Sequence, residues 1–169
     1  DRTDLFHIVV AGGPCACNPE PLADFVDLFF IGEGEQVDLE VIRLYQACKK
    51  EGKSKEEFLQ EAAQIQGVYV PSLYSVTYHD DGTIKEMIPH ATAPQTVRKR
   101  LELDMDKAYF PEKFVVPSIE IVHDRAVAEV QRGCIRGCRF CQAGFIYRPV
   151  REKSIDMINR QCRSICEYT

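Results

Sequence analysis

Three cysteines near the C-terminal end constrain this chain more than any other feature of its sequence. Cys134, Cys138 and Cys141 follow a C-x3-C-x2-C spacing within the segment QRGCIRGCRFCQAG. A chain of 169 residues with eight cysteines would show this spacing by chance about 0.02 times. No charged-then-apolar segment at the amino end suggests secretion, so metal or redox chemistry explains the cysteines better than disulfides do.

The number of cysteines in the motif bears on the kind of metal site. Structural zinc prefers four ligands, so three thiolates are one short. A [4Fe–4S] cluster held by three cysteines leaves one iron open to a small molecule, which is a catalytic arrangement. Gly133 and Gly137 leave room for the backbone to wrap around such a centre, and Arg132, Arg136 and Arg139 add positive charge. A zinc site completed by a fourth residue, in a non-catalytic or interaction module, is the alternative.

The first 50 residues are predicted to form a strand, a helix, a second strand and a second helix. Residues 7–11 and 27–31 are short, apolar and typical of buried strands. Asn18 before proline predicts a helix start, and residues 37–50 are amphipathic. This alternation predicts an α/β fold, and because two strands do not make a parallel sheet, further strands are expected upstream.

The middle of the chain, residues 51–124, is predicted to be a connector with local structure. A capping box predicts a helix over 55–66. The segments 73–79 and 83–88, joined by Asp-Asp-Gly, predict a β-hairpin, and prolines predict extended crossings elsewhere.

The C-terminal stretch contains the cysteines. It is predicted to form a strand over 126–130, a loop over 131–153, and a helix that Ser154 caps and Ile155 begins.

Two segments resemble a known family. The C-x3-C-x-aromatic-C motif, with Phe140 as the aromatic residue, resembles the cluster motif of radical S-adenosylmethionine (SAM) enzymes. The sequence around it resembles a mostly uncharacterised family of radical SAM proteins with a B12-binding-like amino-terminal domain. This segment, residues 116–154, is VPSIEIVHDRAVAEVQRGCIRGCRFCQAGFIYRPVREKS. GGPCACNPEPLADFVDLFFIGEGE, residues 12–35, resembles the carboxy-terminal half of that Rossmann-like domain.

The resemblance implies a division into three parts. Residues 1–50 would be the second half of a B12-binding-type Rossmann-like domain, and 51–124 the connector. Residues 125–169 would supply the first strand, cluster loop and helix of a radical SAM barrel. Only 28 residues follow Cys141, and the first residue is not methionine. We therefore expect a fragment that is inactive alone. Cobalamin stays open, and no residue of this chain supports it.

The resemblance also implies the chemistry. Cys134, Cys138 and Cys141 would ligate three irons, SAM would chelate the fourth, and the backbone near Phe140 would meet the adenine. One electron from the reduced cluster would cleave SAM to a 5′-deoxyadenosyl radical that acts on an unknown substrate, with methyl or methylthio transfer as a candidate reaction. A flavodoxin or ferredoxin would supply the electron.

The distribution of charge along the chain indicates which partners are expected. The net charge is −5, although the loop 131–153 carries six bases and one acid. Because tRNA methylthiotransferases are related radical SAM enzymes, one explanation of these bases is that they bind an RNA substrate. The other explanation is a solvated loop whose positive charge balances the charge of the cluster. The apolar runs are too short to span a bilayer, so no membrane partner and a cytoplasmic location are expected.

The other cysteines have simpler explanations. Cys15 and Cys17 are predicted to be loop residues, and Cys48 to lie in the core. Cys162 and Cys166 are predicted to pack on the core side of a helix.

The sequence gives weaker indications for two further segments. The Gly-Glu-Gly-Glu loop 32–35 lacks a third glycine for the dinucleotide fingerprint, so a ligand loop and a structural turn both stay open. His123-Asp124-Arg125 is predicted to be an interdomain tie without a chemical role.

Overall fold

The chain divides into two compact units, Asp1–Leu101 and Glu102–Thr169, which are described separately below. The computed structural model describes residues 3–5, 7–111, 113–122, 125 and 127–168. His123 and Asp124, and with them most of the predicted interdomain tie, lie outside the described residues. The unit boundary at 101/102 does not coincide with the predicted boundaries at 50/51 and 124/125, and the identity of each domain stays a prediction.

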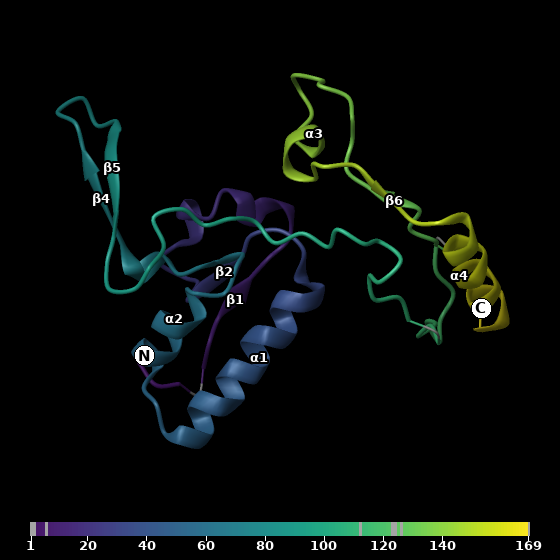
Figure 1. Cartoon of the computed structure of the whole chain (residues 1–169), viewed down its shortest axis with the longest axis horizontal. Coiled ribbons are helices and arrows are strands. Elements are labelled where there is room, and N and C mark those ends of the chain that lie inside the picture. The colour runs from purple at the N-terminus through teal and green to yellow at the C-terminus, as the bar shows by residue number, and fades with distance from the viewer. Residues whose placement is uncertain (1–2, 6, 112, 123–124, 126, 169) are drawn as a thin grey trace. The chain divides into compact units, whose positions relative to one another are not determined.

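A three-stranded sheet forms the centre of the first unit (Figure 1). β1 (Val10–Ala11) pairs in parallel with β2 (Leu28–Phe30), which confirms two of the expected strands in shortened form. β3 (Val68–Tyr69) pairs antiparallel with the other edge of β2, so that Phe29 lies opposite Tyr69. The mixed α/β fold is as predicted, although β3 was not expected.

Two helices cover one face of this sheet (Figure 1). α1 (Gly34–Glu51) begins three residues before the predicted helix, and α2 (Lys55–Ala62) begins where the capping box placed it. The backbone N–H of Glu57 donates to Ser54 Oγ at 3.2 Å, and Ser54 N–H donates to Glu57 Oε2 at 2.8 Å. α2 ends earlier than predicted because the chain must turn to bring Val68 into β3.

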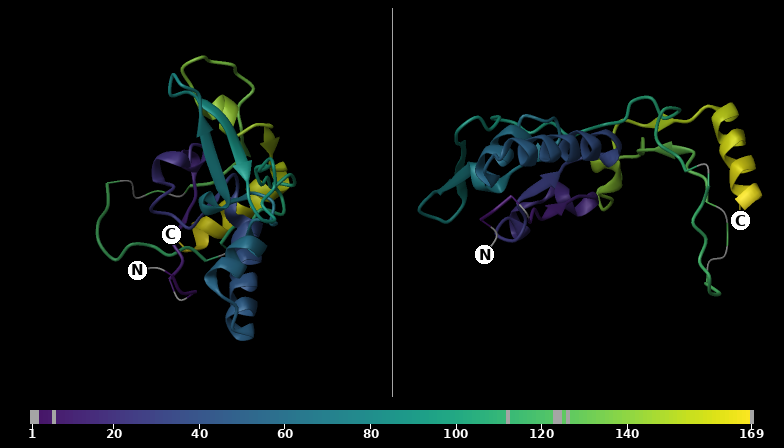
Figure 2. Two further views of the ribbon diagram at one scale, coloured as in Figure 1. Left: turned by 90° about the vertical axis from the view of Figure 1, so that its left-hand side faces the viewer. Right: turned by 90° about the horizontal axis from the view of Figure 1, so that it is seen from below.

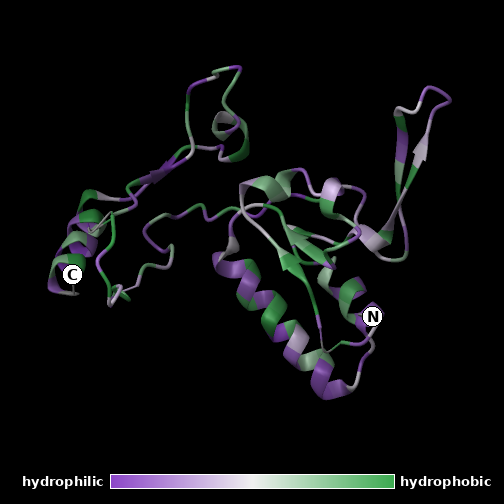
Figure 3. Cartoon of the chain, turned by 180° about the vertical axis from the view of Figure 1, so that it is seen from behind, coloured by the Kyte–Doolittle hydropathy of each residue, from purple (hydrophilic) through white to green (hydrophobic). Residues whose placement is uncertain are grey.

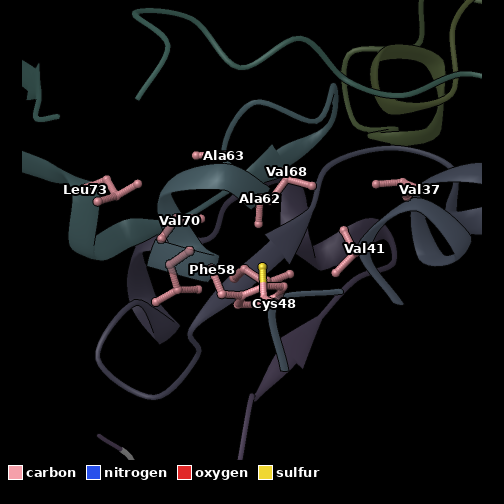
Figure 4. Close-up of a cluster of buried hydrophobic side chains, with 11 residues drawn as sticks. Val37, Val41, Cys48, Phe58, Ala62, Ala63, Val68, Val70 and Leu73 are labelled. Atoms are coloured by element: carbon pink, nitrogen blue, oxygen red, sulfur yellow. The ribbon is translucent and has the colours of Figure 1, made fainter. Parts of the chain in front are cut away.

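The core lies between the helices and the sheet. Alternation along β2 points Leu28 to the helices and Phe29 to the opposite face, where it packs with Tyr69 and Ala16. Figure 3 shows β1 and β2 as hydrophobic, whereas α1 carries hydrophilic and hydrophobic residues in alternating bands. The main cluster, shown in Figure 4, consists of Leu28, Val37, Val41, Cys48, Phe58, Leu59, Ala62, Ala63, Val68, Val70 and Leu73.

The helix predicted from Asn18 is wrong. Two short 3₁₀ helices, Pro14–Cys17 and Glu20–Leu22, take its place on the sheet face away from α1. The chain turns back into β2 at Leu28, which leaves too little length for the predicted helix. Phe25, expected on a helix face, is 68% exposed.

The predicted hairpin is confirmed. β4 (Tyr74–Tyr78) pairs antiparallel with β5 (Ile84–Pro89) around the Asp-Asp-Gly turn. Gly82 N–H donates to His79 O at 2.9 Å and closes the turn. The hairpin extends away from the sheet of its unit (Figure 2).

In the second unit, residues 102–122, for which the prolines predicted extended crossings, contain no helix or strand in their described part. The elements of this unit are β6 (Gln131–Arg132), α3 (Ala143–Ile146), β7 (Arg151–Glu152) and α4 (Ile155–Tyr168). The strand predicted over 126–130 is misplaced: residue 126 is outside the described part, residues 127–130 are not in a strand, and the pairing begins at Gln131.

The predicted start of α4 is confirmed. Met157 N–H donates to Ser154 Oγ at 3.1 Å, and Ser154 N–H donates to Asp106 Oδ1 at 2.8 Å. No helix in the described part of the chain is long and apolar enough to cross a membrane.

Candidate metal centre

A short antiparallel ladder closes the cysteine loop at its base. Arg132 of β6 lies opposite Arg151 of β7, and Lys153 N–H donates to Val130 O at 3.0 Å, which extends the pairing by one step. The chain between β6 and β7 leaves and returns at one place, and all three motif cysteines lie within it.

The two limbs of the loop touch directly beside the first cysteine. Gly133 has φ +93°, and a Cβ there would lie 2.7 Å from both Tyr147 O and Pro149 O. Such a distance is far below van der Waals contact, so no larger residue fits without moving the backbone. Glycine is therefore required next to Cys134 by the closure of the loop.

A second close approach lies further along the loop. A Cβ on Gly144, in α3, would lie 2.8 Å from Arg136 O. The chain between the first two motif cysteines thus lies directly against α3, and the loop is held both at its base and near its middle.

The three cysteines themselves are accessible. Cys134 and Cys141 are half-buried, and Cys138 is exposed. Arg136 N–H donates to Cys134 Sγ at 3.4 Å, and Cys141 N–H donates to Cys138 O at 3.1 Å. The side chain of Phe140 is 93% exposed.

The structure does not gather the three sulfurs around one point. Within the described residues, no group of three or more histidine, cysteine, aspartate or glutamate side chains is placed to hold a metal ion. The donor set nevertheless fits the cluster chemically, because the loop offers three free thiols and no acidic residue lies between Gly133 and Arg151.

A charged group that sequence reasoning missed stands at the base of the loop. Arg132 donates to both oxygens of Glu129, from Nε at 2.7 Å and from Nη2 at 3.0 Å. Lys153, whose side chain is fully buried, lies 3.5 Å from Glu129 Oε2 and 3.3 Å from Gln161 Oε1. The hydrogen bonds from Arg132, followed by the charges of both cations, lower the pKa of Glu129 below its ordinary value.

Arg151 is a second buried cation at the base of the loop, with 7% of its surface exposed. Its guanidinium donates from Nε to Pro149 O at 3.0 Å, from Nη1 to Glu102 O at 2.7 Å and from Nη2 to Tyr147 O at 3.4 Å. Period-two alternation of Arg151 and Lys153 around exposed Glu152 is the sequence signal that indicates an inward-facing pair of cations.

The remaining cysteines divide by burial. Cys48 is fully buried, as predicted, and Cys15 and Cys17 are exposed in the first 3₁₀ helix. The core positions predicted for Cys162 and Cys166 are wrong, because both are exposed on α4. The buried positions of that helix are Gln161 and Ile165, one residue earlier in each case.

The Gly-Glu-Gly-Glu loop makes a structural contact. Gly32 forms an isolated bridge with Arg100, and Glu33 N–H donates to Arg100 O at 3.0 Å. The Arg100 guanidinium in turn binds Glu40 of α1, at 2.5 Å from Nη2 to Oε1. These contacts give the turn a structural role, and a ligand role stays a prediction.

Residues 1–71 match the family model for the N-terminal region of radical SAM proteins. That segment contains β1, β2, β3, α1 and α2 and ends before the cysteine loop. The match supports a relationship between this chain and radical SAM proteins, as the resemblance implied.

A relative with more complete coverage of this chain comes from Methanocaldococcus jannaschii. It is an uncharacterised protein, 33% identical over 153 residues, and the alignment covers 88% of this chain and 26% of the relative. The chain thus spans about a quarter of the length of this curated relative. No solved structure matches the chain.

Proposed function

We propose that this chain is part of a radical SAM iron–sulfur enzyme in which Cys134, Cys138 and Cys141 hold a [4Fe–4S] cluster. One observation carries the proposal: a three-cysteine loop follows a segment that matches the N-terminal region of radical SAM proteins. The chemistry of the donor set agrees, because three thiolates leave one iron of the cluster available to SAM.

The roles of this chain's residues follow from the loop. The three cysteines would bind the cluster, and Phe140, exposed between the second and third of them, would border the adenosyl part of SAM. When bound, the cluster would supply the electron that cleaves SAM, and the protein would orient both partners and keep water away. Because the chain spans about a quarter of its relative, the activity is proposed for the longer protein, and these 169 residues alone are expected not to form 5′-deoxyadenosine.

Metal analysis after anaerobic purification tests the proposal. The full-length protein is expected to contain close to four iron and four sulfide per chain, with the absorption of a [4Fe–4S] cluster. Replacing Cys134, Cys138 and Cys141 together by serine should remove the iron. The matched control is Cys162→Ser with Cys166→Ser, two exposed cysteines outside the loop, which should leave the iron content unchanged.

The zinc alternative predicts a different result from the same samples. One zinc per chain, no colour and no sulfide would contradict the proposal and favour a non-catalytic module. Formation of 5′-deoxyadenosine from SAM and a reductant by the iron-containing protein, and not by the triple serine variant, would link the cluster to the chemistry.

The partners remain part of the proposal. A flavodoxin or ferredoxin is proposed as electron donor. A reducing, cytoplasmic compartment is proposed because metal or redox chemistry explains the cysteines better than disulfides do. For an RNA substrate the charge argument weakens, since Arg132, Arg151 and Lys153 are engaged inside the loop frame. Cobalamin gains no support from any residue of this chain.

A further inference from the structure

Two structural features of the cysteine loop meet at the same pair of backbone oxygens. The carbonyls of Tyr147 and Pro149 accept hydrogen bonds from the buried guanidinium of Arg151. The same two oxygens lie where a side chain on Gly133 would have to stand. Arg151 therefore binds the two carbonyls of the return limb, and the absence of a side chain on Gly133 leaves the space that these carbonyls occupy.

From this convergence we propose that Arg151 is a positioning residue, which fixes the return limb of the cysteine loop against the backbone of Gly133, the residue before Cys134. Its third hydrogen bond, to Glu102 O, ties that limb to a segment 49 residues earlier in the chain. One buried side chain thus joins two backbone segments, the return limb at Tyr147 and Pro149 and the chain at Glu102. That this arrangement serves a cluster rests on the proposed function.

The geometry of the contact requires arginine in particular. A guanidinium presents five N–H groups in a rigid planar fork, whereas the ammonium of lysine is a compact group on a flexible stem. Three carbonyls approached from Nε, Nη1 and Nη2 use three different corners of that fork. Lysine would keep the charge and lose the simultaneous hydrogen bonds to the return limb and to Glu102 O.

Hydrogen exchange in iron-free protein tests the positioning role without any cluster. In Arg151→Lys the amides of residues 134–150 should exchange about tenfold faster than in the wild type, which corresponds to the loss of one hydrogen bond to a charged group. Exchange in α4 should not change. The matched control is Arg139→Lys, an exposed position in the same loop, which should leave the exchange of the loop unaltered.

A second variant reaches the same contact from the other side. Gly133→Ala introduces a methyl group against Tyr147 O and Pro149 O while leaving Arg151 in place, so it should accelerate exchange over the same residues. If α4 and the loop accelerate together in both variants, Arg151 has only a general structural role and the inference is overturned. If the loop amides of Arg151→Lys exchange at the wild-type rate, the inference is also overturned.

Whether Arg151 also affects the cluster is measured separately, in reconstituted full-length protein. Arg151→Lys should release iron to a chelator about tenfold faster than Arg139→Lys and should change the electron paramagnetic resonance signal of the reduced cluster. Iron release and a signal identical to the wild type would refute this link. Wild-type protein that binds no iron would refute the proposed function instead, and the exchange experiment would still decide the role of Arg151.

Discussion

The guanidinium of Arg132 binds both carboxylate oxygens of Glu129, three residues earlier in the chain, through Nε at 2.7 Å and Nη2 at 3.0 Å. Lys153, the residue after β7, places its Nζ 3.5 Å from the same carboxylate. One acid therefore lies between cations from both limbs of the cysteine loop. We therefore expect the Glu129 carboxylate to stabilise the base of the loop.

Acid should weaken the second unit through Glu129. Because its partners lower its pKa in the folded protein, Glu129 contributes fully above its ordinary value of 4.5 and loses this contribution as the pH falls through the lowered value. Glu129→Gln should therefore be less stable than the wild type at neutral pH by about 1 kcal/mol, since the pair is partly exposed. The difference should shrink between about pH 5 and pH 3.

Chemical denaturation at several pH values, followed by a probe in the second unit, measures this difference. Glu152→Gln is the matched control, because Glu152 is an exposed glutamate in β7. A difference between Glu129→Gln and the wild type that stays constant down to pH 3 would show that the carboxylate charge is not what stabilises the ladder.

The core of the first unit should depend strongly on Phe58. The ring is fully buried and meets Tyr45 edge to face, with 5.8 Å between the ring centroids. Phe58→Ala removes this contact and leaves a cavity, so the free energy of unfolding should fall by about 3–5 kcal/mol. Urea unfolding monitored by circular dichroism gives the value. Phe25→Ala, at a position 68% exposed in the same unit, should change stability by less than about 0.5 kcal/mol.

The start of α2 offers a smaller, local effect. Ser54→Ala removes the acceptor of the Glu57 N–H and should cost about 1 kcal/mol in the same unfolding experiment. Ser54→Asp keeps an acceptor at the cap and should recover most of the loss. Equal stability of the alanine and aspartate variants would mean that the cap contributes little to this unit.

Local signals explain which elements could be predicted from the sequence. The capping box fixed the start of α2, the Asp-Asp-Gly turn fixed the hairpin, and the period of apolar residues indicated α1. Each of these depends on residues within one or two turns of chain. β3 could not be found this way, because its two residues become a strand only by pairing with β2.

The errors on α4 have a physical cause that lies outside the helix. The i,i+4 spacing of Cys162 and Cys166 predicts that they share a face, and the equally spaced Gln161 and Ile165 are the pair that is buried. These two faces differ by one residue, about 100° around the helix. The polar Gln161 is turned inward because it accepts a hydrogen bond from the buried Lys153. Hydrophobicity alone cannot indicate such a partner.

The candidate site shows the same limit. The spacing of Cys134, Cys138 and Cys141 was sufficient to propose the ligands. The frame that carries them depends on Arg151, whose partner Glu102 O is 49 residues away. From the sequence Arg151 counted as one more cation of a basic loop. Its alternation with Glu152 and Lys153 could indicate that it faces inward, whereas no local pattern indicates its distant partner Glu102 O.

Thiol reactivity should separate the cysteines by their surroundings. In iron-free folded protein, iodoacetamide should modify Cys15, Cys17, Cys162 and Cys166 readily, because all four are exposed. Cys48 is fully buried, and burial raises the pKa of its thiol, so it should react about a hundredfold more slowly and only when the unit opens. Mass spectrometry of peptides after timed labelling provides the rates. Phe58→Ala, which loosens the same core, should make Cys48 react faster while the rates at Cys162 and Cys166 stay as they were. Rapid labelling of Cys48 in the wild type would contradict the core shown in Figure 4.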